Sequence, residues 1–399
     1  MTSGQFSEKS LQEGYKFAQL GPKSIQIPKE WCVTKISEIS EVKYGKSLPD
    51  TGGEIPAVGS SGLYDYVNKS LIDDDTIVIG RKGSAGEAYL LREPCWPSDT
   101  AFYLSEFKHD KIDLGFVYHH MSLHSLSDEL EQTSIPSLDR NRLENYQMPA
   151  PPLSEQQQIT NILSVVDQEI QQTDEIIEKT EELKRGLRND LIINGLTHKE
   201  YQPFRVGPFD FKIPSSWDVC TVSECVDNLD SQRIPVKKTD REEMEGDIPY
   251  YGASGQIDTV DDWLFNDELL LLAEDGENLL SRNKPISFKV SGKSWVNNHA
   301  HVLKPNSDMS LVYLLNYFEV LSYEPYATGT AQPKLNQKVL NSLKVPKPPK
   351  SEQDEIADVL NQVTAKIEQE YKRRTILQEL KRGLMQDLLT GKVRVNINN

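Results

Sequence analysis

A proline-rich approach followed by a long helical pattern occurs twice in this chain. The first copy reads PAPPLSEQQQIT from Pro149 and continues to EELKRGLRNDL, and the second reads PKPPKSEQDEIA from Pro346 and continues to QELKRGLMQDL. Equivalent residues are always 197 apart, from Pro149 and Pro346 (346 − 149 = 197) to Gly186 and Gly383 (383 − 186 = 197). A stretch duplicated without a gap over this length predicts one structural unit that is present twice.

Each copy carries the local signals that begin and continue a long helix. The prolines ahead of it cannot lie inside a helix, so they mark its approach. Ser154 is a suitable N-cap residue and Gln157 completes a capping box, while Ser351 and Asp354 occupy the matching positions of the second copy. A helix from Ser154 to Leu191 would be about 55 Å long, at about 1.5 Å per residue.

The apolar residues of both predicted helices form a narrow stripe on an otherwise charged surface. Such a stripe is typical of a helix that packs against one partner helix, as in a coiled coil, and each copy offers the other a matching partner. The residues predicted to pack in this spacer are Ile159, Ile162, Val166, Leu183, Gly186, Leu187, Ile356, Val359, Val363, Leu380, Gly383 and Leu384.

The two glycines of this packing set have a specific interpretation. A glycine inside a helix costs about 1 kcal/mol relative to alanine, so Gly186 and Gly383 suggest that the two helix backbones, or the backbone of a partner, approach closely there. The alternative is that both glycines are tolerated near fraying helix ends.

A second layer of repetition lies in the segments between the helices. IPAVGSSGLYDYV from Ile55 corresponds to IPYYGASGQIDTV from Ile248 (248 − 55 = 193), and Trp96 corresponds to Trp295 (295 − 96 = 199). The changing offset predicts globular regions that accept insertions, whereas the helices do not. Short strands with glycine-rich turns and helices over 114–126 and 311–321 predict an α+β fold. The predicted segments are 1–152 and 198–349, both globular, and 153–197 and 350–399, both containing a spacer helix.

Composition narrows the class of protein. The chain has 399 residues, 37% hydrophobic residues and no apolar run that approaches a membrane span, so two or more domains and a cytoplasmic location are expected. The start lacks the pattern of a signal peptide. Cysteines 32, 95, 220 and 225 contain no CxxC pair, which favours reduced thiols packed in cores over a zinc site. The formal net charge of −17 argues against a generic nucleic-acid coat.

Several local patterns that invite an enzymatic reading fail on spacing. Gly292-Lys293-Ser294 lacks the glycine that a phosphate-binding loop needs at position 287, and the glycines at 80, 83 and 86 fit a turn better than a dinucleotide motif. His119, His120 and His124 could form a metal cluster, but Leu314 and Leu315 occupy the matching positions in the second half, which favours a packing helix.

Signatures of catalysis are also missing. No tetrapeptide of an adenine methyltransferase, no glycine motif for S-adenosylmethionine and no nuclease constellation is present, so no cofactor and no catalytic residue are expected.

The duplicated P-x-P-P-x-S-E-Q helix, the repeated I-P-x-x-W segment and the I-P-x-x-G-x-S-G turns carry a family resemblance. With TGTAQPKLN from Thr328 and the stretch from Trp295 to Leu303, their order resembles the specificity (S) subunit of type I restriction-modification systems over essentially the whole chain. Each motif alone is weak, but the duplicated order is specific.

The resemblance implies two target-recognition domains that each read one half of a bipartite DNA site. It also implies two long antiparallel helices as the spacer, with a pseudo-twofold internal repeat. The implied partners are double-stranded DNA, two modification subunits that methylate adenine, and restriction subunits that translocate and cut DNA. Half-sites on one face of B-DNA recur about every 34 Å, a distance that a helix pair of this length could span.

Candidate DNA contacts are residues on loops that can donate to bases or neutralise phosphates. In the first half these are Lys43, Lys46, Ser60, Ser61, Arg81, Lys82, Ser84, Arg140 and Arg142. In the second half they are Arg233, Lys237, Lys238, Ser254, Arg282, Asn297, Asn298, Gln332 and Lys334. For any single residue the alternative is a solvated surface group, and the asparagines together with His299 could instead cap a turn.

Two rival functions remain open at this point. A coiled-coil scaffold with protein-binding globular ends would show no salt-dependent DNA binding. A self-contained methyltransferase would bind S-adenosylmethionine without a partner, although its motifs are missing.

Overall fold

The computed structural model divides the chain into two compact units. Unit 1 comprises Met1–Asp174 with Lys372–Asn399, and unit 2 comprises Glu175–Tyr371. The residues that the structure describes are 11–20, 23–123, 126, 130–131, 137–329 and 332–395. The division into four consecutive segments stays a prediction, since each compact unit contains portions of both long helices.

The long helices are α4 (Leu153–Asn194) and α10 (Lys350–Leu388). They begin one residue before Ser154 and Ser351, so these serines lie in the first turn and the predicted N-cap assignment is wrong by two positions. Helix boundaries of this kind shift easily by a residue, because the cap is decided by the backbone of the preceding loop.

The two residues after each of these serines fasten the helix to its unit. Glu155 is fully buried and accepts a hydrogen bond of 3.1 Å from Trp31 Nε1, and Glu352 accepts one of 2.9 Å from Trp217 Nε1. The last residue of the repeated S-E-Q sequence, Gln156 in the first copy, accepts from the backbone N–H of Asp113 at 2.8 Å. The repeated motif is therefore an anchoring device for the globular region.

The second copy of the anchor sets the correspondence between the units. Gln353 accepts from the backbone N–H of Ser310 at 2.8 Å, as Gln156 does from that of Asp113. This places Asn316 and Tyr317 where His119 and His120 stand, so the sequence-based match of these histidines to two leucines is wrong by two positions.

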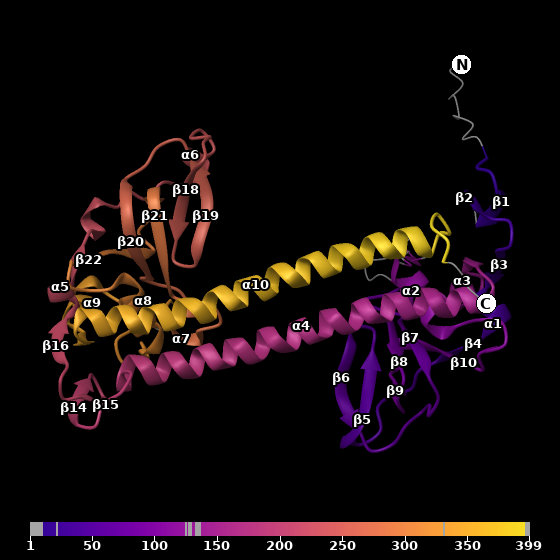
Figure 1. The fold of residues 1–399 in the computed structure, drawn as a ribbon, viewed down its shortest axis with the longest axis horizontal. Helices are drawn as coiled ribbons and strands as arrows, with labels where there is room; N and C mark the ends of the chain where they lie inside the picture. Colours follow the sequence, from indigo (N-terminus) through magenta and orange to yellow (C-terminus); the bar gives the residue numbers. More distant parts are fainter. Residues whose placement is uncertain are drawn as a thin grey trace. The chain divides into compact units, whose positions relative to one another are not determined.

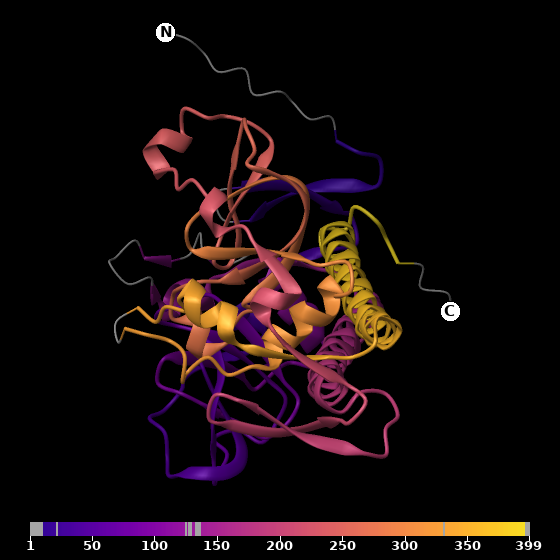
Figure 2. The same ribbon diagram turned by 90° about the vertical axis from the view of Figure 1, so that its left-hand side faces the viewer.

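The helices run antiparallel within each unit. In unit 1, Asp167 pairs with Lys381 at 2.5 Å, and Asp174 pairs with Arg374 at 3.2 Å. Later residues of α4 therefore contact earlier residues of α10. In unit 2, Tyr371 donates to Glu181 at 2.8 Å, and Glu352 accepts from the backbone N–H of Leu196, beyond the end of α4. Figures 1 and 2 show the two helices side by side from two directions.

The predicted packing stripe is only partly confirmed. Its buried members are Ile159, Val166 and Ile356, and its partly buried members are Leu187, Val359, Val363 and Leu384. Ile162, Leu183 and Leu380 are instead exposed. Leu163, Leu360 and Ile367, which the predicted set does not include, are buried. The stripe is displaced because these helices also contact globular segments, so the buried face is wider than a coiled-coil seam.

The predicted close approach between the two helix backbones at the spacer glycines is wrong, whereas approach by a partner stays a prediction. A Cβ added at Gly186 or Gly383 would meet nothing within 4 Å. Both glycines are exposed, so they are tolerated residues, as in the alternative interpretation.

The globular region of unit 1 carries a four-stranded and a three-stranded sheet besides two-stranded pairs. One has the order β4-β10-β7-β8, from Glu41–Tyr44, Ala101–Ser105, Thr76–Gly80 and Ala88–Leu91, and the other has the order β6-β5-β9, from Gly62–Val67, Thr51–Gly59 and Trp96–Pro97. Helix α2 (Leu114–Leu123) packs on β7 and β8. The remaining elements are β1 (Tyr15–Leu20), β2 (Lys23–Pro28), β3 (Cys32–Lys35), α1 (Ile36–Ile39), β11 (Leu130–Glu131), β12 (Ser137–Leu138), α3 (Arg140–Glu144) and β13 (Gln147–Ala150).

In unit 2 the corresponding strands merge into one six-stranded sheet, β17-β22-β20-β21-β18-β19 (Figure 1). Its strands are Val226–Asn228, Ala300–Pro305, Phe265–Ala273, Ser287–Val296, Ile248–Gly252 and Gly255–Val260. Strand β21 pairs with β20 along one part and with β18 along another, which joins the two halves of the sheet. Helix α8 (Leu311–Val320) packs on β20 and β21. The remaining elements are β14 (Tyr201–Val206), β15 (Phe209–Pro214), β16 (Asp218–Thr221), α5 (Val222–Cys225), η2 (Asp230–Gln232), α6 (Lys238–Arg241), α7 (Asn278–Ser281), α9 (Gln337–Ser342) and β23 (Lys344–Lys347).

This longer hairpin accounts for the changing repeat offset. Gly80 pairs with Ala101 in unit 1, and Ala273 pairs with Ala300 in unit 2. The spans differ by six residues (300 − 273 = 27; 101 − 80 = 21). The extra residues lie in the turn between the paired strands, since Ile79 pairs with Ala88 and Leu272 pairs with Ser287 (88 − 79 = 9; 287 − 272 = 15). The predicted insertion is thus a longer turn between β20 and β21, which contains α7, and the predicted α+β class is confirmed.

Two smaller expectations concern cysteines and membranes. Cys220 and Cys225 form a disulfide and Cys32 is exposed, so the expectation of four reduced, packed thiols is wrong except for the buried Cys95. No helix in the described part of the chain combines the length and apolar character needed to cross a membrane.

Candidate nucleic-acid interface

The strand ends of unit 1 form a small backbone frame. After β7, the backbone N–H of Arg81 donates to the carbonyl of Thr100 at 2.9 Å, and the carbonyl of Arg81 accepts from Leu138 at 2.9 Å. Lys82 forms an antiparallel bridge with Ser137. Three segments that are distant in sequence are therefore held at one edge of the sheet.

Unit 2 has the same frame at its own strand ends. After β20, the backbone N–H of Glu274 donates to the carbonyl of His299 at 2.9 Å, and the carbonyl of Glu274 accepts from Leu335 at 2.8 Å. Asp275 forms an antiparallel bridge with Lys334. Each contact has its counterpart in unit 1, at the offsets of the repeat.

The side chains on this shared frame have opposite charges. Arg81 and Lys82 of unit 1 stand where unit 2 has Glu274 and Asp275. A matched backbone thus carries basic side chains in one unit and acidic side chains in the other. The predicted set missed both acidic residues, although comparing IGRKG with LAEDG at the offset of 193 would have found them.

Five predicted residues of unit 1 gather around this frame: Ser60, Ser61, Arg81, Lys82 and Ser84. The backbone N–H of Ser60 donates to Thr100 Oγ1 at 3.3 Å. A Cβ at Gly80 would lie 2.2 Å from the carbonyl oxygen of Ser84 and 3.0 Å from that of Ser60, so only glycine allows these loops to meet. The glycines in this segment form a turn, as the sequence predicts.

Arg81 is held against aromatic rings. Its guanidinium carbon lies 5.3 Å from the centroid of Tyr44 and 5.9 Å from that of Phe102, and Nη2 donates to the carbonyl of Asp99 at 2.8 Å. Arg140 lies 5.9 Å from the centroid of Tyr44. Stacking on an aromatic face restricts the guanidinium plane, which suits recognition of a planar partner. Tyr44 was missed because isolated tyrosines carry no spacing signal.

The other predicted residues of unit 1 lie around this cluster. Lys43 pairs with Glu106 at 2.8 Å, and Lys46 is exposed, forming a parallel bridge with Ser98. Arg142 is exposed on α3. Lys43 is thus already neutralised, whereas Lys46 belongs to the same edge as the frame.

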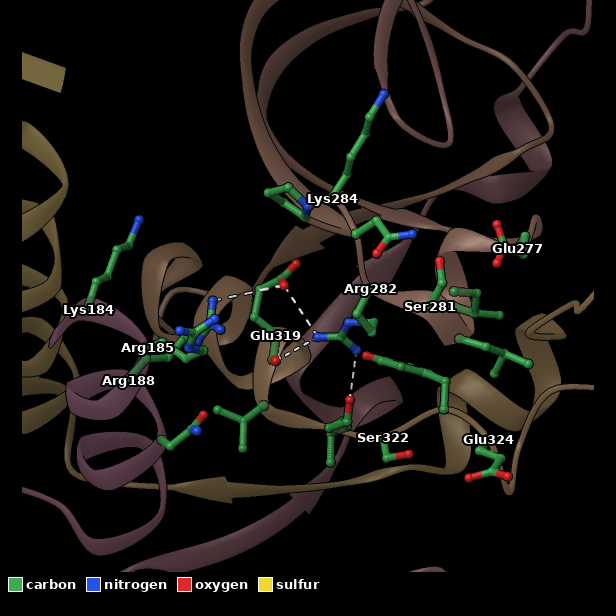
Figure 3. A pocket seen from close by; sticks show the side chains of 18 of the residues that line it. Lys184, Arg185, Arg188, Glu277, Ser281, Arg282, Lys284, Glu319, Ser322 and Glu324 are labelled. Atoms are coloured by element: carbon green, nitrogen blue, oxygen red, sulfur yellow. Dashed lines mark hydrogen bonds and ion pairs between the residues drawn. The ribbon is translucent and has the colours of Figure 1, made fainter. Parts of the chain in front are cut away.

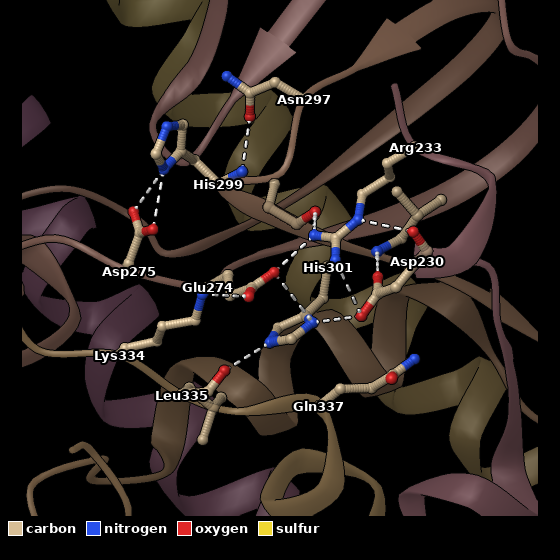
Figure 4. A network of polar contacts seen from close by, with 12 residues as sticks. Asp230, Arg233, Glu274, Asp275, Asn297, His299, His301, Lys334, Leu335 and Gln337 are labelled. Carbon is tan, nitrogen blue, oxygen red and sulfur yellow. Dashed lines mark hydrogen bonds and ion pairs between the residues drawn. The ribbon is translucent and has the colours of Figure 1, made fainter. Parts of the chain in front are cut away.

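A buried ionic network supports the frame of unit 2 (Figure 4). His301, fully buried, contacts Asp230 Oδ2 through Nδ1 at 2.6 Å and the carbonyl of Leu335 through Nε2 at 2.8 Å. Arg233 donates to Glu274 at 2.6 Å and to the carbonyl of Ala300 at 2.6 Å. Both ring nitrogens of His301 are thus within hydrogen-bond distance of an oxygen.

The charges of this network are balanced within unit 2. Lys334 pairs with Glu274 at 2.9 Å, and Arg233 lies 3.5 Å from Asp230. The predicted contacts Arg233 and Lys334 are therefore joined here, and Arg233 is largely buried with its guanidinium committed to protein partners.

The network is also the metal-like cluster that the described residues contain. Asp230, Glu274 and His301 place one ligand atom each within 4.8 Å of one another. The ring nitrogens of His301 are committed to hydrogen bonds, and Arg233 and Lys334 already supply the positive charge. These donors fit an ionic network and do not fit a divalent metal.

The histidines of α2 are packing residues. His119 and His120 are buried, and burial lowers the pKa of His119 to about 4, which favours a neutral ring. His124 lies outside the described residues.

Three of the remaining predicted residues of unit 2 are Asn297, Asn298 and Ser254. Asn297 is buried and accepts from the backbone N–H of His299 at 2.8 Å, so it caps a turn. Its neighbour Asn298 is exposed beside it, as is Ser254 in the turn between β18 and β19. His299 contacts Asp275 at 2.8 Å.

Others of the predicted set lie apart from the frame. Lys237 and Lys238 are exposed at the start of α6, and Gln332 is exposed beside Pro333. Arg282 holds the end of α8, since its guanidinium donates to the carbonyls of Glu319 and Leu321. Whether any of these residues contacts DNA stays a prediction.

The chain matches known proteins over nearly its whole length. A family model described as the type I restriction modification DNA specificity domain matches residues 28–182 and 214–382. The MjaVIII specificity subunit of a type I restriction enzyme from Methanocaldococcus jannaschii is 26% identical, over 94% of this chain and 96% of that protein. A putative type I restriction enzyme specificity subunit from Haemophilus influenzae is 35% identical over 36% of each chain.

Solved structures share the fold. The type I restriction-modification S subunit from M. genitalium aligns with a TM-score of 0.64 at 18% identity, covering 90% of this chain and 96% of that one. A chain from a structure of a type I restriction-modification system aligns with a TM-score of 0.51 at 13% identity, covering 92% and 100%. The chain belongs to the family of type I restriction-modification DNA specificity proteins.

Proposed function

We propose that this chain is the DNA-reading subunit of a type I restriction-modification complex, in which each unit reads one half of a bipartite, asymmetric site. The observation that carries this proposal is the shared backbone frame with opposite side-chain charges. A duplicated scaffold would keep such a frame and vary its side chains if each copy had to recognise a different half-site.

The side chains on the two frames suit different base edges. Arginine can donate two hydrogen bonds to guanine, asparagine can pair with adenine, and carboxylates accept from the amino group of cytosine. Unit 1 offers Arg81 and Lys82, whereas unit 2 offers Asp275 and Asn298. Two unlike readers favour a site without palindromic symmetry.

The chemistry belongs to partners of this chain. We infer a non-catalytic role, with two modification subunits that methylate adenine and restriction subunits that translocate and cut DNA. The relatives named above, which are subunits of restriction enzymes, support this inference. Helices α4 and α10 would space the two readers and dock the modification subunits, and the complex would act in the cytoplasm.

The test is the methylation pattern of the host genome with the gene present and deleted. Loss of one bipartite N6-methyladenine motif is expected on deletion. Replacing residues 23–148 with the same region of a relative should change one half of that motif only. A change in both halves, or an unaltered methylome, would contradict the two-reader proposal.

A second experiment reverses the charge of two frame residues in unit 1. Arg81→Glu with Lys82→Asp should relax or alter one half-site, because the donors become acceptors. Arg92→Ala is the matched control, since Arg92 forms an exposed ion pair with Asp75 at 2.9 Å, away from the frame contacts described above. An unchanged motif in the charge-exchanged variant would remove Arg81 and Lys82 from the set of readers.

A further inference from the structure

Unit 2 contains a cavity of about 1160 Å³ beside α4 (Figure 3). One wall is the part of α4 from Glu181 to Asn189, and another is the segment 277–285 that follows β20. The end of α8 and residues 321–324 complete it. The cavity is therefore lined by elements of one unit.

Glu319, whose carboxylate lines the cavity, already has partners for both of its oxygens within the protein. Glu319 Oε1 accepts from the backbone N–H groups of Ile286 and Ser287, each at 2.8 Å. Its Oε2 lies 3.3 Å from Arg282 Nη2 and 3.9 Å from Arg188 Nη1. Figure 3 shows these arginines converging on Glu319. Glu319 thus serves the fold and is shared by two cations.

Other cations of the lining lack such a partner. Within the described residues, Lys184, Arg185 and Lys284 have no carboxylate oxygen within 4.0 Å. Arg188 Nε is buried without a hydrogen-bond acceptor. Burial lowers the pKa of Lys184 and of Arg188, as expected where positive groups lose water without full compensation.

In unit 1, the lysine that corresponds to Lys184 has a carboxylate partner. Lys381, the counterpart of Lys184 (381 − 184 = 197), pairs with Asp167 at 2.5 Å. The counterpart of Asp167 in unit 2 is Thr364 (364 − 167 = 197), whose hydroxyl donates to the carbonyl of Leu360 at 2.8 Å. Unit 2 keeps the lysine and lacks its counter-ion.

A second difference between the units adds one positive and one negative charge to unit 2. Arg188 and Glu319 correspond by the same offset to Met385 and Ser122 of unit 1. The partly buried arginine is therefore a feature of unit 2 alone, and it comes with its own carboxylate partner. The basic group of unit 2 that has lost its counter-ion is Lys184.

The cavity adjoins the frame of the candidate interface. Its wall begins at Glu277, two residues after Asp275, and the backbone N–H of Gly276 donates to the carbonyl of Pro333 at 3.0 Å. Pro333 lines the cavity and precedes Lys334 of the frame. A polyanion that contacts the frame can therefore continue into the cavity, which favours a DNA strand over a separate acidic peptide.

We propose that the basic side chains of this cavity that lack a carboxylate partner bind backbone phosphates of the DNA strand that runs out of the half-site read by unit 2. This inference rests on the proposed function. Phosphate contacts carry no base preference, so the cavity would contribute affinity and register while the frame contributes specificity.

The experiment measures DNA binding by the complex purified through a tag on this chain. A labelled duplex with the methylated site and a scrambled duplex are titrated by fluorescence anisotropy at several salt concentrations. Arg185→Gln is compared with Arg382→Gln, its exposed counterpart on the same helical position in unit 1 (382 − 185 = 197). The triple variant Lys184→Gln, Arg185→Gln, Lys284→Gln gives the full effect.

The slope of log K against log salt should fall by about 1 for Arg185→Gln and by about 3 for the triple variant. Both duplexes should weaken equally, and Arg382→Gln should leave the slope unchanged. An unchanged slope in the triple variant overturns the inference, as does loss of co-purifying subunits, which would assign the cavity to an acidic protein segment. If the unaltered complex shows no preference for the site duplex, the proposed function itself fails, and this inference with it.

Discussion

At the scale of single residues, unit 2 places two carboxylates in its interior and surrounds them with donors. Burial opposes ionisation of Asp230, but hydrogen bonds from His301 and Val302 and the charge of Arg233 outweigh it, so the pKa of Asp230 lies below its ordinary value. Burial likewise opposes ionisation of Glu274, and the donors Arg233 and Lys334 outweigh it. Removing one side chain of such a network leaves the others buried without their charge partners, so the network is sensitive to substitution.

We expect unit 2 to lose stability in acid. A carboxylate whose pKa is lower in the folded state binds more protons when unfolded, so its contribution is present above the unfolded pKa of about 4 and is lost as pH falls further. The urea midpoint of the full chain between pH 3 and 6 measures this loss. Asp230→Asn should lower the free energy of unfolding by about 1–3 kcal/mol at pH 7. The variant should also lose less stability than the unaltered chain as the pH falls from 6 to 3. The exposed Asp218→Asn is the control, and an equal effect from it would contradict this assignment.

At the scale of elements, α4 and α10 depend on contacts that are not all helix to helix. Glu155 and Gln156 attach α4 to the globular region of unit 1, and Glu352 and Gln353 do so for α10 in unit 2. Exposed residues such as Leu183, with 55% of its surface accessible, lie in the middle of the predicted seam. Each helix is thus stabilised mainly where it meets its unit.

The spacer glycines should be replaceable by alanine with a gain. Gly186→Ala and Gly383→Ala are each expected to stabilise the chain by about 1 kcal/mol, because both lie inside a helix with open space around the new methyl group. Gly115→Ala on α2 is the contrasting control, since its Cβ would lie 2.3 Å from Thr160 Cγ2. Urea unfolding compares the three variants. Destabilisation by the spacer substitutions would restore the idea of a close backbone approach.

At the scale of the whole molecule, charge is the property that fits DNA binding least well. The chain carries a net charge of −17, while phosphate contacts need local positive charge. The cation excess is local, around Arg81 in unit 1 and around Lys184 in unit 2. A strongly acidic chain with such patches suits a subunit that relies on basic partners to complete its groove.

The isolated chain should therefore bind DNA weakly. We expect an affinity at least about tenfold lower than that of the complex at physiological salt, because repulsion from the acidic surface is not offset. Electrophoretic mobility shifts of one duplex with the chain alone and with the complex test this. Tight, site-specific binding by the chain alone would show that no basic partner is needed.

Local sequence signals determined much of this protein. The duplication, the positions of α4 and α10, the helices starting at Leu114 and Leu311 and the insertion in the second globular region all follow from periodicity, proline and offsets between copies. Such signals depend on neighbours within a few residues, or on comparison of the chain with itself. The antiparallel sense of the helices followed from the family resemblance.

Only the tertiary structure decided which polar groups meet. The frame around Arg81 joins segments brought together by β pairing over long sequence distances, and no local pattern encodes that pairing. For the same reason the sequence predicts Arg233 to be an exposed cation, whereas in the fold it is largely buried and pairs with Asp230 and Glu274. The face of each helix that is buried also depended on what packs against it, because a charged helix with a sparse stripe leaves that choice to its surroundings.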